Sequence, residues 1–378
     1  MLINIQLLRM LAAMMVVFYH TSVHVRASGV AQGGFFEVME AVGFAGVDIF
    51  FVISGFIMAH TSFAASGPQD AWSFLRRRLA RIYSGYWPFF LLALIIFSWV
   101  NPALLHKAKL LQSVILWPAY PLLIAVSWTL IFELFFYLLF TLIISISDRR
   151  RSLLLHGLFV LMLGYSLYSQ FVLHTYAKGN LETITAAEYC MFSPYLMEFL
   201  GGAVLAGWLR GQAGKPASRQ VEYRNFFLLG SGCALFLFAG WINNHWFDGA
   251  IEQGYTVFYR VLVFGAPSLL ILASLVRLEQ NGRHAPKRFS LLTGAASYAI
   301  YLSHGLILAI TQKLGFNEFA GSLGGWTMQA LYITLVAAIL GYSVLHFRMI
   351  EQPLHQIFKR GLRLQVRTRS DAPTTSPL

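Results

Sequence analysis

The chain's most constraining feature is a series of apolar runs, each close to 20 residues long, that recurs from one end to the other. A run of that length is what an α-helix needs to cross a bilayer. Of the 378 residues, 57% are hydrophobic and only 12% are charged, whereas a soluble domain carries about 25% charged residues. The sequence therefore predicts an all-α, polytopic transmembrane helical bundle of about ten helices. We expect spans at roughly 5–24, 38–59, 83–100, 122–146, 153–173, 190–209, 225–243, 255–276, 290–312 and 326–346.

Basic residues gather in alternate connections between these spans. They lie at 76–81, 149–151, 210–224 and 277–288, and again after residue 347. Because Lys and Arg favour the cytoplasmic side, this pattern predicts that both termini are cytoplasmic, which an even number of spans satisfies. The net charge of +12 is then a topology signal, and we expect no nucleic-acid partner.

The apolar spans indicate one transmembrane domain at 1–355, followed by a basic, disordered cytoplasmic tail at 356–378. Around the connection at 101–121, the stretch SVILWPAYPLL is too short and too proline-rich to cross a membrane. It predicts a re-entrant or interfacial segment. Two cysteines, Cys190 and Cys233, are too few for a disulfide framework or a common zinc site, and we expect no metal.

Arg9 and His20 lie eleven residues apart in the first span. At about 100° per residue, both side chains face the same way, about 16 Å apart along the helix. Ionisable groups inside a membrane are costly and therefore indicate function. His20 is the natural proton acceptor, because an unperturbed imidazole titrates near pH 6.5. The alternative for His20 is a structural hydrogen bond between helices.

Further ionisable residues fall within the expected spans, namely Asp48, Glu133, Glu198, Arg260 and His304. Each is expected to face the bundle interior beside a partner. Asp48 suits either an ion pair, with Arg9 or Arg260, or a substrate contact. Glu133 suits either proton handling or helix clamping, and either carboxylate is a candidate to orient His20. We expect Glu198 and Arg260 to be structural partners.

In the segment WSFLRRRLARIYSGYW, at 72–87, four arginines within six positions are flanked by Trp72, Tyr83, Tyr86 and Trp87. One interpretation is positive-inside charge that meets anionic headgroups. The other is a polyphosphate site, because guanidinium forks match phosphate oxygens and aromatic rings support a nucleotide base.

Together these segments resemble the acyltransferase 3 family of bacterial membrane proteins, over about residues 3–355. The resemblance rests on six motifs in order: Arg9 and His20 as R-x10-H, GVDIFFVISGFIM (46–58), RRRLARIYSGYW (76–87), WTLIFE (128–133), SYAIYLSH (297–304) and IEQP (350–353). Ser84 stands where the family often has proline, which is a change in helix-start geometry.

The resemblance implies transfer of an acyl group, usually acetyl, from cytoplasmic acetyl-CoA or another acyl-CoA to a carbohydrate hydroxyl. It implies His20 as general base, with Arg9, Glu133 and Asp48 as the other catalytic residues. Donor binding would fall to Arg76, Arg78, Arg81, Tyr86 and Trp87, and further substrate contacts to Trp128, Ser297, Tyr301 and His304. The expected acceptor is a polysaccharide or lipid-linked glycan, and the expected place is the bacterial cytoplasmic (inner) membrane, beside polysaccharide-synthesis machinery.

The arginines at 76–81 are expected on the cytoplasmic side, whereas His20 is expected near the outer end of its span. We therefore expect the pantetheine arm of the donor to extend into the bundle and the acceptor to approach from outside. Two other functions stay open, a proton-coupled transporter or flippase of a lipid-linked sugar, and a structural partner of a polysaccharide synthase.

Overall fold

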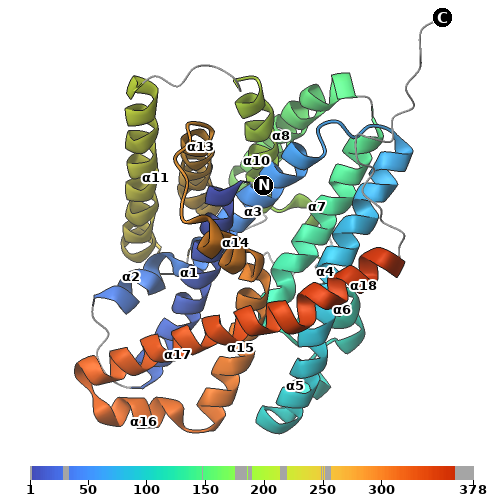
Figure 1. Ribbon diagram of the computed structural model, residues 1–378. Helices are drawn as coiled ribbons and strands as arrows, with labels where there is room; N and C mark the ends of the chain where they lie inside the picture. The colour runs from blue at the N-terminus through green and yellow to red at the C-terminus, as the bar shows by residue number, and fades with distance from the viewer. Residues whose placement is uncertain are drawn as a thin grey trace, which may run out of the picture.

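The computed structural model describes residues 2–28, 34–146, 148–174, 185, 190–212, 219–247, 249, 251 and 257–361. These residues form helices and connections with no strand, as the apolar runs predict (Figure 1). The helices are α1 Ile3–Ala27, α2 Phe35–Val42, α3 Gly46–Thr61, α4 Pro68–Val100, α5 Pro102–Lys107, α6 Leu110–Ile115, α7 Trp128–Ser145, α8 Asp148–Phe171, α10 Tyr195–Arg210, α11 Arg219–Trp246, α12 Val257–Arg260, α13 Ala266–Gln280, α14 Lys287–Ala295, α15 Ser297–Lys313, α16 Phe316–Leu323, α17 Gly325–His346 and α18 Gln352–Gly361. Short 3₁₀ turns lie at Gly43–Ala45 and Ala125–Ser127, and π-helical turns at Val261–Gly265 and Phe347–Glu351.

Within the described residues, eight helical stretches are long and apolar enough to span a membrane, and α14 with α15, bent by 53°, makes a ninth. The polytopic architecture is thus confirmed. The span expected at 190–209 corresponds to α10, which has 16 residues. That is about 24 Å of helix, shorter than a hydrocarbon core of about 30 Å.

Helix α10 lies in the bundle core against α3, in direct backbone contact. A Cβ on Gly55 would lie 1.8 Å from the carbonyl oxygen of Phe199, and one on Gly202 would lie 2.1 Å from that of Val52. Only glycine permits this approach, which is how small residues bring membrane helices together. The two helices run parallel, since Phe63 beyond the end of α3 packs under Arg210 at the end of α10.

The first helix begins against the last turn of α13. The Glu279 carboxylate accepts hydrogen bonds from the backbone N–H groups of Ile3, at 2.6 Å, and Asn4, at 2.8 Å. A carboxylate is favourable at a helix N-terminus, where backbone N–H groups lack partners within the helix. This contact holds the start of α1 beside the end of α13.

The segment after α4 turns back along that helix, as the proline-rich stretch predicts. Tyr83 and Tyr86 donate hydrogen bonds to the carbonyls of Ile115 and Ser113, at 2.7 and 2.8 Å. Tyr86 lies fourteen residues before the end of α4, so α6 returns by about 21 Å. Helix α7 runs antiparallel to α4, and its Tyr137 packs on Phe74 near the start of α4. The chain therefore has to return along α4 before α7 begins.

A bent rod made of α17, the second π-helical turn and α18 crosses the bundle (Figure 1). It packs on α15 and α4. Its π-helical turn ends at Glu351, which is fully buried. A π-helical turn adds a residue to a helix and rotates the side chains that follow it. This turn presents a carboxylate to α4.

Candidate active site

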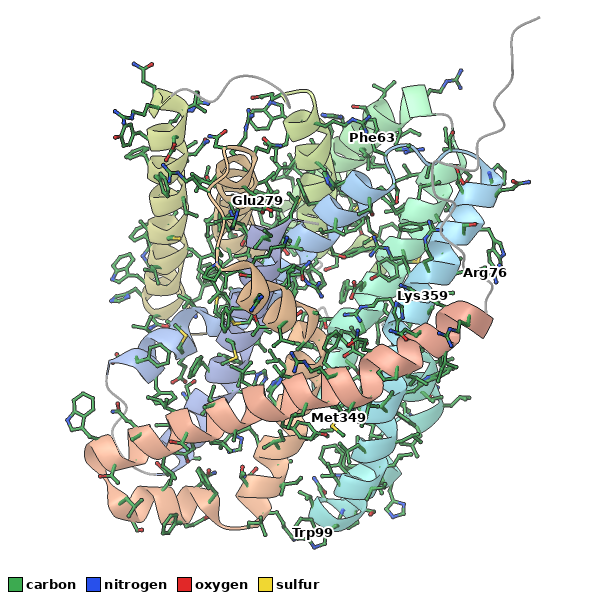
Figure 2. The ribbon with its side chains drawn as sticks, viewed as in Figure 1. Phe63, Arg76, Trp99, Glu279, Met349 and Lys359 are labelled. Atoms are coloured by element: carbon green, nitrogen blue, oxygen red, sulfur yellow. The ribbon has the colours of Figure 1, made fainter. Side chains whose placement is uncertain are left out.

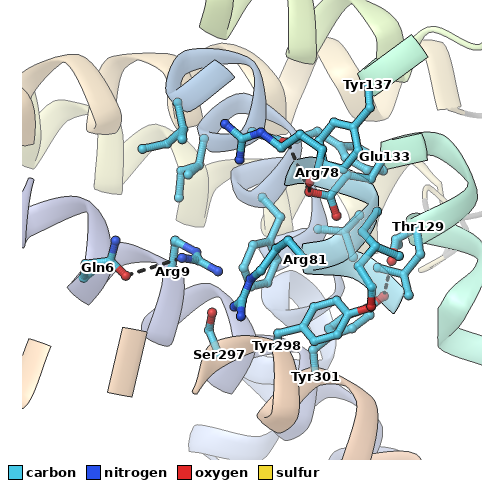
Figure 3. Close-up of a pocket in the computed structure, with 18 residues that line it drawn as sticks. Gln6, Arg9, Arg78, Arg81, Thr129, Glu133, Tyr137, Ser297, Tyr298 and Tyr301 are labelled. Carbon is cyan, nitrogen blue, oxygen red and sulfur yellow. Dashed lines mark hydrogen bonds between the residues drawn. The ribbon is translucent and has the colours of Figure 1, made fainter. Parts of the chain in front are cut away.

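A cavity of about 180 Å³ lies between α1, α3, α4, α7 and α15 (Figure 3). Its polar wall is formed by Gln6, Arg9, Ser54, Arg78, Arg81, Thr129, Glu133, Tyr137, Ser297, Tyr298 and Tyr301, and its apolar wall by Val47, Phe50, Phe51, Ile53, Ile57, Ile82 and Leu130. Of the residues singled out from sequence, the structure thus gathers Arg9, Arg78, Arg81, Glu133, Ser297 and Tyr301 around one space.

Each cavity arginine is held differently. Arg81 donates to the Glu351 carboxylate at 2.6 Å, with 28% of its own side chain exposed and none of its partner's. Arg78 donates to the Thr61 hydroxyl at 3.2 Å and lies over the ring of Tyr137. In the part of the chain that the structure describes, the hydrogen bond of Arg9 is to the Gln6 amide oxygen, at 3.4 Å.

Glu133 lines the cavity wall contributed by α7. Its carboxylate accepts a short hydrogen bond from the Tyr137 hydroxyl and a longer one, 3.4 Å, from Ser54. Figure 3 shows Arg9 and Arg81 pointing into the middle of the cavity from opposite walls, with Glu133 beside Tyr137. With three arginines, the lining carboxylate Glu133 and Glu351 behind Arg81, this site carries an excess of one positive charge. A buried excess charge is costly, so the cavity favours an anionic ligand.

His20 is not among the residues that line this cavity. Its Nδ1 lies 2.9 Å from the Val16 carbonyl oxygen and 3.2 Å from Nε2 of His304. No hydrogen bond described for His20 involves Glu133 or Asp48, the carboxylates expected to orient it. Side-chain contacts link His20 to the cavity. His304 contacts Tyr301, with ring centres 5.9 Å apart, and Tyr301 lines the cavity.

Asp48 forms a buried ion pair, one of the two roles that the sequence left open. Its carboxylate accepts hydrogen bonds from Arg260 at 3.1 Å through Nε and 2.6 Å through Nη2. Glu198 packs beside this pair, fully buried, against Gly265. Arg260 is therefore the structural partner that the sequence predicts, whereas both carboxylate oxygens of Glu198 are buried without a hydrogen-bond partner among the described residues. Asp48 does not line the cavity.

Five residues expected at the donor or substrate site lie outside the cavity lining, and one of them is His304, which contacts His20 instead. Tyr86 and Trp87 bind the returning segment after α4, through Ser113 and the Val114 carbonyl. Trp128 packs on Phe51 at the start of α7. Arg76 lies near the outer edge of the molecule, above Lys359 (Figure 2).

The sequence interpretation missed Glu351, Gln6, Tyr137 and Tyr298 as site residues. Glu351 belongs to the IEQP motif, but it follows the last expected span, and no role was assigned to it. Tyr298 has an aromatic side chain in an apolar run, which core packing explains equally well. Among the described residues, no group of three or more His, Cys, Asp or Glu side chains is placed to hold a metal ion.

The fold and cavity define a polytopic membrane protein with a basic, partly apolar site between its helices. The family described as an acyltransferase domain matches residues 2–348. This chain therefore belongs to the acyltransferase 3 family and is a membrane acyltransferase.

Two curated proteins are similar over most of their length. The exopolysaccharide production protein ExoZ of Rhizobium meliloti (strain 1021) is 27% identical over 329 residues, which cover 83% of this chain and 90% of that protein. The acyltransferase MdmB of Streptomyces mycarofaciens is 27% identical over 365 residues, which cover 89% of this chain and 86% of that protein. No solved structure is similar to the chain.

Proposed function

We propose that this acyltransferase moves an acyl group, acetyl in the simplest case, from acyl-CoA to a hydroxyl of a polysaccharide or lipid-linked glycan. The observation that carries this proposal is the cavity itself, where three arginines converge inside a bundle of acyltransferase family helices. An acyl-CoA supplies the anionic phosphates that such a site favours, together with the acyl group that the family transfers.

In this proposal, Arg78 and Arg81 bind the donor phosphates at the end of the cavity near the basic part of α4. Guanidinium groups bind phosphate through paired hydrogen bonds. The cavity volume of about 180 Å³ is below the roughly 300–1,000 Å³ of sites that enclose a whole small molecule. Only part of a CoA molecule fits inside, so the nucleotide stays outside while the pantetheine arm extends between the helices.

Arg9 reaches the cavity from α1 and is the cation least engaged by protein groups there. We assign it to the thioester carbonyl or an adjacent phosphate. A fixed cation beside that carbonyl stabilises the negative charge that develops on its oxygen. The same charge would be poorly stabilised in the surrounding hydrocarbon.

His20 is proposed as the general base on the acceptor hydroxyl. Its Nε2 takes the hydroxyl proton while the oxygen attacks the thioester carbon, and the carbon–sulfur bond then breaks. The proton passes from His20 to the departing CoA sulfur, so that the products are an O-acyl ester and free CoA thiol. Because Arg9 and His20 lie about 16 Å apart along α1, donor and acceptor meet between them, near Tyr301.

The carbohydrate acceptor is proposed from the name of one relative, an exopolysaccharide production protein. A bacterial cytoplasmic membrane location, with acyl-CoA supplied from inside and neighbouring polysaccharide-synthesis proteins, follows from the same proposal. The spanning helices and the membrane acyltransferase family agree with it.

The donor site is tested by binding of acetyl-CoA to the purified protein in detergent. The double variant Arg78→Ala, Arg81→Ala should weaken binding by at least 10-fold, since each charge-assisted hydrogen bond contributes about 1.5–3 kcal/mol. Arg77→Ala is the matched control, because Arg77 is on the same helix but exposed and outside the cavity. Unchanged affinity in a well-folded double variant would refute the donor-site assignment.

A further inference from the structure

The pair formed by His20 and His304 has a geometry that assigns a separate role to each ring. His20 belongs to α1 and is partly exposed, whereas His304 belongs to α15 and is fully buried. The ring centres lie 4.9 Å apart. His20 is the more exposed of the two rings, and His304 lies between it and Tyr301 of the cavity wall.

The hydrogen-bond partners of His20 fix the position of its proton. A backbone carbonyl only accepts hydrogen bonds, so Nδ1 of His20, 2.9 Å from the Val16 oxygen, carries a hydrogen. A neutral imidazole has one N–H, and Nε2 of His20 is therefore the nitrogen with a free lone pair. Nε2 is the nitrogen that a general base uses here.

The same argument fixes the state of His304. Its Nε2 lies 3.2 Å from Nδ1 of His20, which already carries the hydrogen. In this arrangement Nε2 of His304 is the acceptor, and its own proton lies on Nδ1, a buried nitrogen without a hydrogen-bond partner among the described residues. The N–H of His20 is shared between the Val16 carbonyl and the lone pair of His304.

We infer that His304 is a positioning residue, whose Nε2 lone pair holds His20 in the tautomer that leaves its Nε2 free to accept a proton. This inference rests on the proposed function of His20 as general base. When His20 takes the hydroxyl proton, its Nδ1–H becomes a stronger donor, and the neutral acceptor stabilises the cation that forms. His304 neither gains nor loses a proton. In many hydrolases an aspartate orients the catalytic histidine, and here a second, neutral histidine occupies that place.

The variants His304→Gln and His304→Leu separate orientation from packing. The amide oxygen of glutamine replaces the acceptor at Nε2, whereas leucine fills the space without one. We expect kcat for acetyl transfer to fall roughly 10- to 100-fold in His304→Leu, because the lost hydrogen bond is to a ring that becomes charged in the reaction. The KM for acetyl-CoA should not change, and His304→Gln should recover most of the lost kcat.

Two controls keep the result interpretable. His346→Leu removes another buried histidine, which stacks on Phe89, and should leave kcat unchanged. In a His20→Gln background, His304→Leu should have no further effect on turnover, because the residue that it orients is gone. Melting temperatures in detergent report any general loss of folding.

Different outcomes contradict the role of His304 and the role of His20. Equal loss in His304→Gln and His304→Leu, or full kcat in His304→Leu, would overturn the positioning role. Full activity in His20→Gln would instead overturn the proposed function of His20. An additive effect of His304→Leu in the His20→Gln background would show that His304 acts on its own and also contradict the inference.

Discussion

Individual charged residues in this bundle serve two different purposes. Arg260 and Asp48 satisfy each other, with both side chains almost fully buried. Arg9, by contrast, has one long hydrogen bond within the described part of the chain, to a neutral amide on its own helix. Because charges in a membrane are stabilised by partners, the unsatisfied arginine marks the site and the satisfied one marks the scaffold.

The Asp48–Arg260 pair leads to a stability prediction. Breaking a buried ion pair from one side leaves an uncompensated charge and costs about 3–5 kcal/mol. Asp48→Asn should therefore lower the melting temperature strongly, while the fraction that remains folded binds acetyl-CoA with wild-type affinity. Normal stability combined with lost turnover would instead support Asp48 as a catalytic residue.

At the scale of elements, the segment between α4 and α7 determines where α7 begins. Three aromatic side chains on one face of α4, Tyr83, Tyr86 and Trp87, donate hydrogen bonds to backbone carbonyls of this segment. Irregular backbone at membrane depth needs such partners, since lipid provides none. The segment in turn places the start of α7, with Thr129 and Glu133, at the cavity.

Tyr86→Phe tests this structural role. Removing the hydroxyl leaves the Ser113 carbonyl with the longer hydrogen bond from the Leu116 N–H, 3.3 Å, and should cost about 0.5–1.5 kcal/mol of stability. The KM for acetyl-CoA should stay within twofold of wild type, which enzyme kinetics in detergent would measure. A large rise in KM with unchanged stability would instead support the interpretation that Tyr86 contacts the nucleotide base of the donor.

The sequence predicted the apolar spans and a connection at 101–121 that does not cross the membrane, because both follow from local composition. Arg9, Arg78, Arg81 and Glu133 could be chosen because charges in apolar runs are rare. Tyr86, predicted to contact the donor, lies outside the cavity lining and bonds the Ser113 carbonyl, because an aromatic side chain near arginines looks the same whether it binds a nucleotide or a loop. The contact of Glu351 with Arg81 joins residues 270 positions apart, and a π-helical turn in an apolar helix leaves no readable signal.

At the scale of the whole molecule, the helix directions agree with the charge pattern. The start of α1 lies beside the end of α13, and α10 runs parallel to α3 despite its short length. Helix α18 ends on the basic part of α4, where His355 contacts Ser84. Both described ends of the chain therefore lie near basic segments, and the cytoplasmic location of both termini stays a prediction.

Reporter fusions test that orientation. A reporter fused after residue 378 should show cytoplasmic activity, and one inserted between Gly324 and Gly325, at the turn between α16 and α17, should show activity outside. The expected contrast follows from the positive-inside pattern. The same activity at both positions would mean that α17 does not cross the membrane.

The central claim is that the basic cavity and His20 together move an acyl group from CoA to a sugar hydroxyl. Its most direct test is transfer of labelled acetyl from acetyl-CoA to polysaccharide by the purified protein in lipid vesicles. We predict that the wild-type protein transfers label, that His20→Gln lowers kcat by at least 100-fold, within the roughly 10²–10⁴-fold that general base catalysis contributes, and that His20→Gln still binds acetyl-CoA. Label transfer at the wild-type rate by a folded His20→Gln variant would contradict the account.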